Sequence, residues 1–171
     1  IACAAHRMDA APAGVYEAAV ASMTELNRRP AELLADKEVH AVTDVTGFGL
    51  AGHLLEMLGD GLSAEIDTLS LPLLASVRRL AEEFYLTAAA QRNRAHAETR
   101  GLRFERVPFG VQEVLFDAQT SGGLLIALPR ADAVRLQNMR SARRFLCSSN
   151  GRFPARRFGG HSARHRKPQD R

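Results

Sequence analysis

The sequence predicts a layered fold of helices and strands, either mixed α/β or α+β. Three observations support this prediction. Short apolar runs of β type alternate with longer segments of helical periodicity. No internal repeat interrupts that alternation, so the elements are expected to form layers around one core. A chain of 171 residues, 46% of them hydrophobic, is long enough to build such a core.

The amino-terminal half contains a regular order of helix and strand signals. A helix is expected over residues 12–28, because Pro12 suits a first turn and apolar residues recur at helical spacing. Pro30 is expected to interrupt it, with another turn or two over Ala31–Asp36. The later elements are a strand at Val39–Thr43, a helix at Phe48–Leu58 that ends at Gly59, and a second strand at Ala64–Thr68.

The carboxyl-terminal half repeats the alternation less clearly. Pro72 is expected to open a third helix with a buried face of Leu73, Val77, Leu80 and Phe84. Residues 86–101 are polar and compatible with a helix but have no clear period. Strands are indicated at Arg103–Val107 and Leu124–Leu128, and a helix is expected to start near Asp132.

The net charge of +4 conceals two oppositely charged regions. Residues 1–138 hold 13 basic and 18 acidic side chains, whereas residues 139–171 hold 10 basic side chains and one acid. The second region is rich in Arg, Ser and Gly and poor in aliphatic residues. Because such a segment buries little apolar surface, we expect it to be disordered.

Several classes of protein are excluded by composition. The sequence has no run of 18 apolar residues and no secretory signal, so neither a membrane span nor secretion is expected. Two distant cysteines, Cys3 and Cys147, favour a reduced cytoplasmic setting without a structural disulfide. The first residue is isoleucine, and we expect the chain to be a piece of a longer protein.

The segment VTDVTGFGL at Val42–Leu50 carries the strongest functional signal. Asp44 ends a predicted strand, Gly47 and Gly49 form a tight loop, and a helix follows. Loops of this kind bring backbone N–H groups close to phosphate, and an aspartate there can hold a nucleotide's Mg²⁺. Asp44 could instead be a helix cap, the glycines could serve packing, and Thr46 could donate either to phosphate or within a turn.

A second candidate loop precedes the LLIAL strand. Its residues could orient a substrate, or they could form a glycine turn that leads into a buried strand: Asp117, Thr120, Ser121, Gly122 and Gly123. His53 and Glu56 lie one helical turn apart, but two side chains do not make a metal site, so packing or capping is expected for them. Arg92 and Arg94 flank Asn93 and could meet phosphate or remain solvated.

Two motifs and an upstream helix resemble one enzyme family. Asp44–Leu50 with Gly52–Met57 resembles the TDVTGFGLxGHLLEM segment of the selenide, water dikinases (selenophosphate synthetases). Phe116–Leu125, FDAQTSGGLL, resembles their DPQTSGGLL segment, with Ala118 where proline is usual, and Glu17–Arg28 resembles their EAAxxSMxxLN helix. The resemblance covers about residues 10–138 and corresponds to the family's carboxyl-terminal domain.

The resemblance implies a fold and a reaction. The fold would be α+β, the layered sandwich of the aminoimidazole ribonucleotide synthase superfamily, partly similar to a ferredoxin fold. The reaction would convert selenide, ATP and water to selenophosphate, AMP and phosphate. Asp44 matches the aspartate that joins carboxylates of an amino-terminal domain in binding Mg²⁺ at the ATP phosphates.

The resemblance also defines what this chain lacks. The family's nucleophile and paired lysine belong to an amino-terminal domain, so we expect no catalytic residue here, an inactive fragment, and a homodimer in the intact enzyme. Cys3 does not replace that nucleophile, because no lysine or glycine loop lies near it in the sequence. In this scheme residues 1–11 are the remnant of a link, residues 12–138 the domain, and residues 139–171 a disordered or frameshifted tail.

Two alternatives remain at the level of sequence. The chain could belong to another ATP-dependent enzyme of the same superfamily. It could also be a degenerate, non-catalytic domain whose basic tail binds nucleic acid, although nucleic acid is not the expected partner. The motif TGFGLAGH favours the selenide, water dikinase family over the other enzymes of the superfamily.

Overall fold

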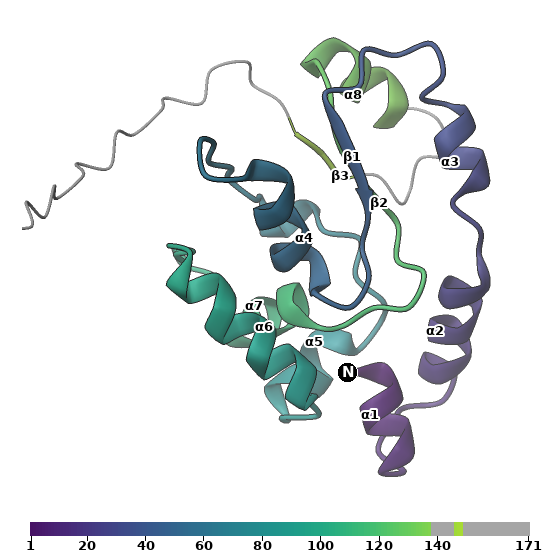
Figure 1. Cartoon of the computed structure of the whole chain (residues 1–171). Coiled ribbons are helices and arrows are strands. Elements are labelled where there is room, and N and C mark those ends of the chain that lie inside the picture. Colours follow the sequence, from purple (N-terminus) through teal and green to yellow (C-terminus); the bar gives the residue numbers. More distant parts are fainter. Residues whose placement is uncertain (138–145, 149–171) are drawn as a thin grey trace, which may run out of the picture.

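A three-stranded mixed sheet stands at the centre of the molecule (Figure 1). The structure is a computed structural model and describes residues 1–137 and 146–148. Strand β1 (Ala41–Asp44) pairs antiparallel with β2 (Leu124–Ala127), and β2 pairs parallel with β3 (Leu146–Ser148). In the β1–β2 register Asp44 lies opposite Leu124, so the end of β1 and the start of β2 meet at one end of the sheet.

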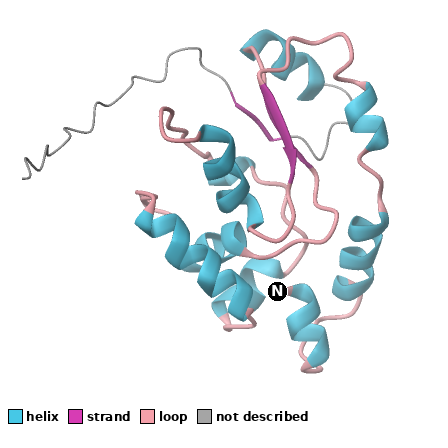
Figure 2. Ribbon diagram, viewed as in Figure 1, coloured by secondary structure: helices cyan, strands magenta, loops and turns pink. Residues whose placement is uncertain are grey.

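Helices flank this sheet on two sides (Figure 2). Helices α1 to α3 lie on one side, α4 to α7 gather on the other, and α8 lies near the end of the sheet distant from the N-terminus (Figure 1). Their bounds are α1 Ala2–Arg7, α2 Val15–Thr24, α3 Arg28–Glu32, α4 Gly49–Leu58, α5 Val77–Glu82, α6 Ala88–Thr99, α7 Phe109–Phe116 and α8 Arg130–Gln137. The predicted α+β class is confirmed.

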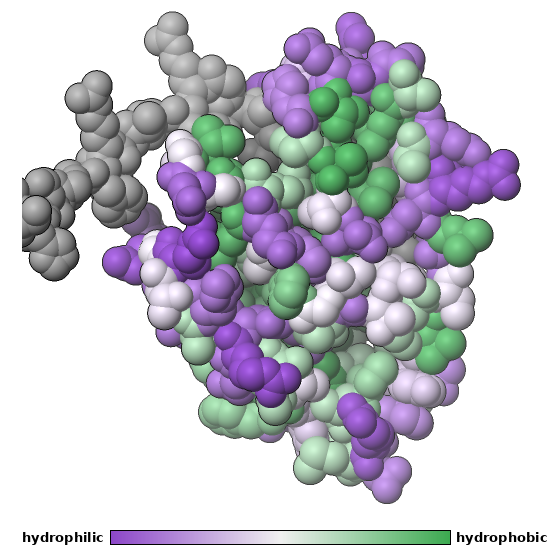
Figure 3. Space-filling view, in the orientation of Figure 1, coloured by the Kyte–Doolittle hydropathy of each residue, from purple (hydrophilic) through white to green (hydrophobic). Residues whose placement is uncertain are grey.

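Three apolar clusters hold these layers together. The central one joins the loop after β1 with α4, α6, α7 and β2 through Val45, Leu50, Ala97, Phe116 and Leu125. A second cluster unites α1, α2 and α5, and a third seats α8 on β2. On the face shown in Figure 3, hydrophobic residues gather over β1 and α8, where Val42 and Val134 are half exposed. The central cluster is the one that supports the candidate site.

Two predicted strands are absent from the described residues. Ala64–Thr68 is extended only in part and continues into a 3₁₀ turn at Thr68–Ser70. The Asp67 carboxylate accepts hydrogen bonds from the Leu69 N–H and the Ser70 hydroxyl, which favours the turn over a strand. Arg103–Val107 is likewise irregular, and it leads into α7, a helix that the sequence prediction missed.

Other helix bounds differ from the prediction for local reasons. Pro30 lies inside α3 because it occupies the first turn, where its missing N–H costs nothing. Helix α5 starts at Val77 rather than at Pro72 and ends before Phe84, whose φ of 65° lies in the left-handed region. Phe84 is therefore 72% exposed instead of belonging to the buried face, and Leu73 is also exposed. The unassigned segment 86–101 forms α6, which begins with a Thr87 cap on the Ala90 N–H.

The two ends of the described chain refine the predicted boundaries. Residues 1–11, expected to be a remnant link, contain α1, whose Ala2 and Ala5 are buried in the second cluster. Leu146–Ser148 lies in the predicted disordered tail but forms β3, because the open edge of β2 offers backbone hydrogen-bonding groups. The rest of the predicted tail lies outside the described residues. Among the helices that are described, none has the length and hydrophobicity needed to span a membrane.

Candidate functional site

Asp44 lies at the end of β1 with an exposed side chain. The glycine loop, which we define as Val45–Gly49, follows at once and ends at the first residue of α4. The strand, loop and helix therefore occur in the predicted order. An exposed carboxylate at this position is free to face a ligand outside the chain.

Backbone contacts fix the conformation of the glycine loop. The Thr46 carbonyl accepts hydrogen bonds from the Gly49 N–H at 3.1 Å and from the Gln119 N–H at 2.9 Å. The Gly47 carbonyl accepts a 2.9 Å hydrogen bond from the Asn93 side chain. Two successive carbonyls are thus bound to neighbouring groups of the protein. Because C=O and the following N–H point in opposite directions across a trans peptide, the N–H groups of Gly47 and Phe48 face away from those neighbours.

The two glycines of this loop have different surroundings. A Cβ on Gly49 would lie 2.8 Å from the Leu115 carbonyl oxygen, and the φ of Gly49 is 69°. Gly49 is therefore required for the close packing of α4 on α7. A Cβ on Gly47 would meet nothing within 4 Å, so packing within the described chain does not require glycine there.

The second candidate loop, Asp117–Gly123, lies directly against the glycine loop. The Val45 N–H donates to the Gly123 carbonyl at 3.0 Å, and the Gln119–Thr46 bond joins the two loops again. A Cβ on Gly122 would lie 2.2 Å from the Val45 carbonyl oxygen. Asn27, just before α3, donates a 2.9 Å hydrogen bond to the Gly122 carbonyl. These contacts support the interpretation of Gly122 and Gly123 as a packed turn that leads into β2.

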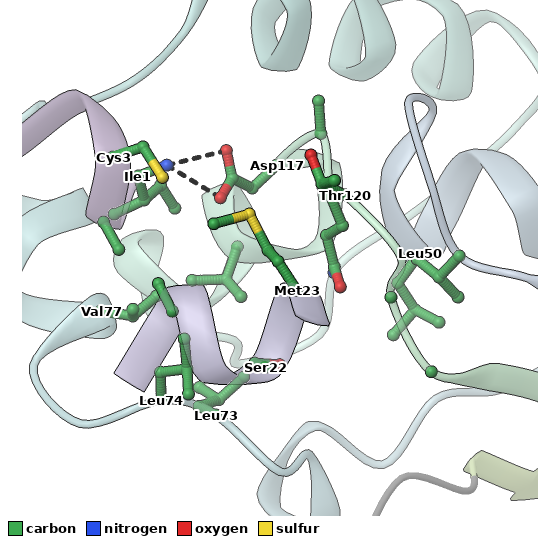
Figure 4. A pocket seen from close by; sticks show the side chains of 18 of the residues that line it. Ile1, Cys3, Ser22, Met23, Leu50, Leu73, Leu74, Val77, Asp117 and Thr120 are labelled. Carbon is green, nitrogen blue, oxygen red and sulfur yellow. Dashed lines mark hydrogen bonds and ion pairs between the residues drawn. The ribbon is translucent and has the colours of Figure 1, made fainter. Parts of the chain in front are cut away.

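A cavity of about 470 Å³ borders the second loop (Figure 4). Asp117, Thr120, Gly122 and Gly123 line it, together with Val45, Leu50 and apolar residues of α1, α2 and the segment 71–74, whereas Asp44, Thr46, Gly47 and Gly49 do not. The Asp117 carboxylate pairs with the Ile1 amino group at 2.9 Å. Burial raises the pKa of Asp117, and the nearby amino group opposes that rise. The predicted residues thus divide between two surfaces.

His53 is buried behind the glycine loop. Its Nε2 lies 3.1 Å from the Thr46 hydroxyl, and its ring packs near Phe48. Its Nδ1 has no hydrogen-bond partner in the described structure, although Glu56 Oε2 lies 3.0 Å away. This placement agrees with the expected packing role.

Arg94 points into the protein rather than toward a phosphate. It forms a close ion pair with Glu113 of α7, a side chain that is 1% exposed, and donates to Gln112. Its guanidinium also lies 5.6 Å from the ring centroids of Phe104 and Phe116. Arg92 stays on the surface of α6. Of the two arginines, Arg94 therefore has a structural role.

The donor set at the glycine loop fits one part of a magnesium–phosphate site. Asp44 supplies an exposed carboxylate oxygen, the ligand type that Mg²⁺ prefers, and the outward N–H groups suit phosphate oxygens. No group of three histidine, cysteine, aspartate or glutamate side chains suited to a metal occurs among the described residues. Asp44 therefore offers one ligand of a site that needs several.

Comparisons with known proteins identify the family of this chain. Residues 2–147 match the family model described as "AIR synthase related protein, C-terminal domain". A protein named selenide, water dikinase from Agathobacter rectalis is 46% identical over 155 residues, which are 91% of this chain and 45% of that protein. Proteins of the same name from Desulfitobacterium hafniense and Burkholderia ambifaria are 44% and 47% identical, over 75% and 66% of this chain.

This chain matches only part of the length of each relative. The three relatives are matched over 45%, 38% and 32% of their own length, so this chain spans less than half of each. The family model nevertheless covers most of the chain, from α1 to β3. The chain belongs to the AIR synthase related protein family, whose carboxyl-terminal domain it represents, and its relatives in that family include selenide, water dikinases.

Proposed function

We propose that this chain is the carboxyl-terminal part of a selenide, water dikinase and contributes Asp44 to a Mg²⁺–ATP site. The observation that carries the proposal is the exposed Asp44 carboxylate beside a loop whose carbonyls are turned into the protein. The names of the relatives support the reaction class. The reaction proposed is the ATP-dependent conversion of selenide and water to selenophosphate, AMP and phosphate.

The chain's own groups would do two things at this site. Asp44 would hold one face of the metal, and the N–H groups of Gly47 and Phe48 would donate to phosphate oxygens. Mg²⁺, when bound, supplies the positive charge that stabilises charge developing on phosphate oxygens. Gly47 leaves space for this approach, because no atom lies within 4 Å of the position of its missing Cβ.

The remaining ligands and the reacting nucleophile would come from an amino-terminal domain. The unmatched length of the relatives leaves room for that domain. The proposal therefore includes an inactive isolated fragment, an amino-terminal partner domain, a homodimer of the intact enzyme and a cytoplasmic setting.

A fusion protein tests this proposal. The amino-terminal part of the Agathobacter rectalis relative is placed ahead of this chain, and selenide-dependent AMP formation is measured. Asp44→Asn should abolish turnover, because the amide removes the negative charge that holds the cation. The matched control is Asp60→Asn, which alters a carboxylate that is 96% exposed and pairs with Arg100 on the surface. Near-normal turnover of the Asp44 variant would contradict the role of Asp44, and an inactive but folded parent fusion would favour a non-catalytic domain.

A further inference from the structure

Asn93 on α6 connects the glycine loop with the end of α7. Its side-chain amide donates to the Gly47 carbonyl at 2.9 Å and to the Phe116 carbonyl at 3.0 Å. Both acceptors are backbone carbonyls, so the contacting atom must be the amide nitrogen with its two hydrogens. One side chain therefore satisfies two carbonyls from segments 69 residues apart in the sequence, those of Gly47 and Phe116.

We propose that Asn93 is a positioning residue that orients the Phe48 N–H toward the phosphate side of the site. The Gly47 carbonyl and the Phe48 N–H belong to one trans peptide unit and point in opposite directions. Holding that carbonyl against α6 therefore turns the N–H away from α6. No described residue accepts a hydrogen bond from the Phe48 N–H, so it is available to a ligand.

The structure around Asn93 makes this orientation specific. Helix α6 is anchored on α7 by the ion pair of Arg94 with Glu113 and by the hydrogen bond from Gln91 to Glu113. Helix α7 in turn contacts α4 at Gly49. Contacts of other residues therefore hold α6 in place, and Asn93 reaches the glycine loop from this fixed helix. Without its amide, the Gly47 peptide loses the one side-chain contact that sets its direction.

The inference rests on the proposed function for the identity of the ligand, but not for the positioning itself. The test therefore has two arms, the first on the 171-residue chain and the second on its fusion with the amino-terminal part of the Agathobacter rectalis relative. The first measures backbone amide exchange in Asn93→Asp, a variant of nearly the same shape that cannot donate. The matched control is Gln112→Glu, which removes the same kind of amide donor, here to the Val107 carbonyl at 2.8 Å, outside the glycine loop.

In the first arm, exchange at Gly49 and Asp117, whose N–H groups donate to the Thr46 and Val114 carbonyls, should be about tenfold faster in Asn93→Asp, because the two hydrogen bonds that hold the neighbouring Gly47 and Phe116 carbonyls are lost. Gln112→Glu should leave those amides unchanged. A uniform increase across the chain, or unchanged exchange in the loop, would overturn the positioning role, since neither is a local effect of Asn93.

The second arm titrates Mg²⁺–ATP into the fusion, because Asp44 alone supplies one ligand of the site, and follows the Phe48 amide signal. The expected result is a Phe48 shift in the parent fusion that is reduced at least fivefold in Asn93→Asp and retained in Gln112→Glu. Equal shifts in parent and Asn93→Asp would overturn the orientation of Phe48 toward phosphate. Local loosening in the first arm with no shift even in the parent would retain the positioning role and reject the Mg²⁺–ATP ligand. The two failures are thereby separated.

Discussion

The glycine loop and the second loop resemble each other in sequence but are built differently. Both contain two glycines, both lie at the same end of the sheet, and they hydrogen-bond to each other. In the glycine loop, Gly47 borders open space and Asp44 is exposed, whereas in the second loop Gly122 is pressed against Val45. The difference supports our proposal that the first loop faces a ligand and that the second supports it.

The largest expected effect is a difference in stability between glycine substitutions in the two loops. Gly122→Ala would place a Cβ 2.2 Å from the Val45 carbonyl oxygen, so we expect a loss of about 3 kcal/mol in the free energy of unfolding. Gly47→Ala is the matched control and should change it by less than about 1 kcal/mol. Urea unfolding of both variants measures the difference. Equal losses would show that the two loops are packed alike.

A smaller loss of stability tests whether Asn27, which lies outside the second loop, stabilises that loop. Asn27→Ala removes the hydrogen bond to the Gly122 carbonyl and should cost about 1 kcal/mol of unfolding free energy. The control is Arg28→Ala, since the Arg28–Glu32 ion pair lies on the surface and should contribute little. The same urea experiment compares the two. If Asn27→Ala lowers the unfolding free energy no more than Arg28→Ala does, Asn27 does not stabilise the second loop.

The smallest effect concerns pH. Burial raises the pKa of Asp117 in the folded protein above its ordinary value of 3.8, so the folded state binds this proton more tightly than the unfolded state. The ionised carboxylate therefore lowers stability at neutral pH, and this loss is relieved as pH falls through the folded-state pKa toward 3.8. Unfolding free energies at several pH values should show the parent chain gaining stability relative to Asp117→Asn over that interval. A constant difference between the two proteins would contradict the effect of burial.

The parts of the site that could be predicted are contiguous in the sequence. Within Val39–Leu58, an apolar run, two glycines and apolar residues at helical spacing predict the order of β1, loop and α4. The LLIAL run predicts β2. Helix α7 was missed because its short apolar sequence carries little periodic signal. The alternating segment before Thr68 predicts a strand, but the hydrogen bond from the Leu69 N–H to the Asp67 carboxylate favours a turn there.

The contacts that distinguish the two loops could not be predicted from local patterns. Asn27 reaches Gly122 across 95 residues, and Asn93 reaches Gly47 across 46. Neither asparagine has a neighbouring residue that reveals its partner. The open space at Gly47 and the crowding at Gly122 likewise depend on tertiary packing, which the local sequence does not reveal.

The most direct test of the central claim replaces Mg²⁺ with paramagnetic Mn²⁺ and adds ATP to the fusion protein in which this chain is isotopically labelled. The measurement is the broadening of each backbone amide signal, which reports proximity to the bound ion. We predict broadening centred on Asp44–Phe48 that disappears in Asp44→Asn and persists in Asp60→Asn. Broadening centred on Asp117–Gly123, or none beside Asp44, would contradict the account.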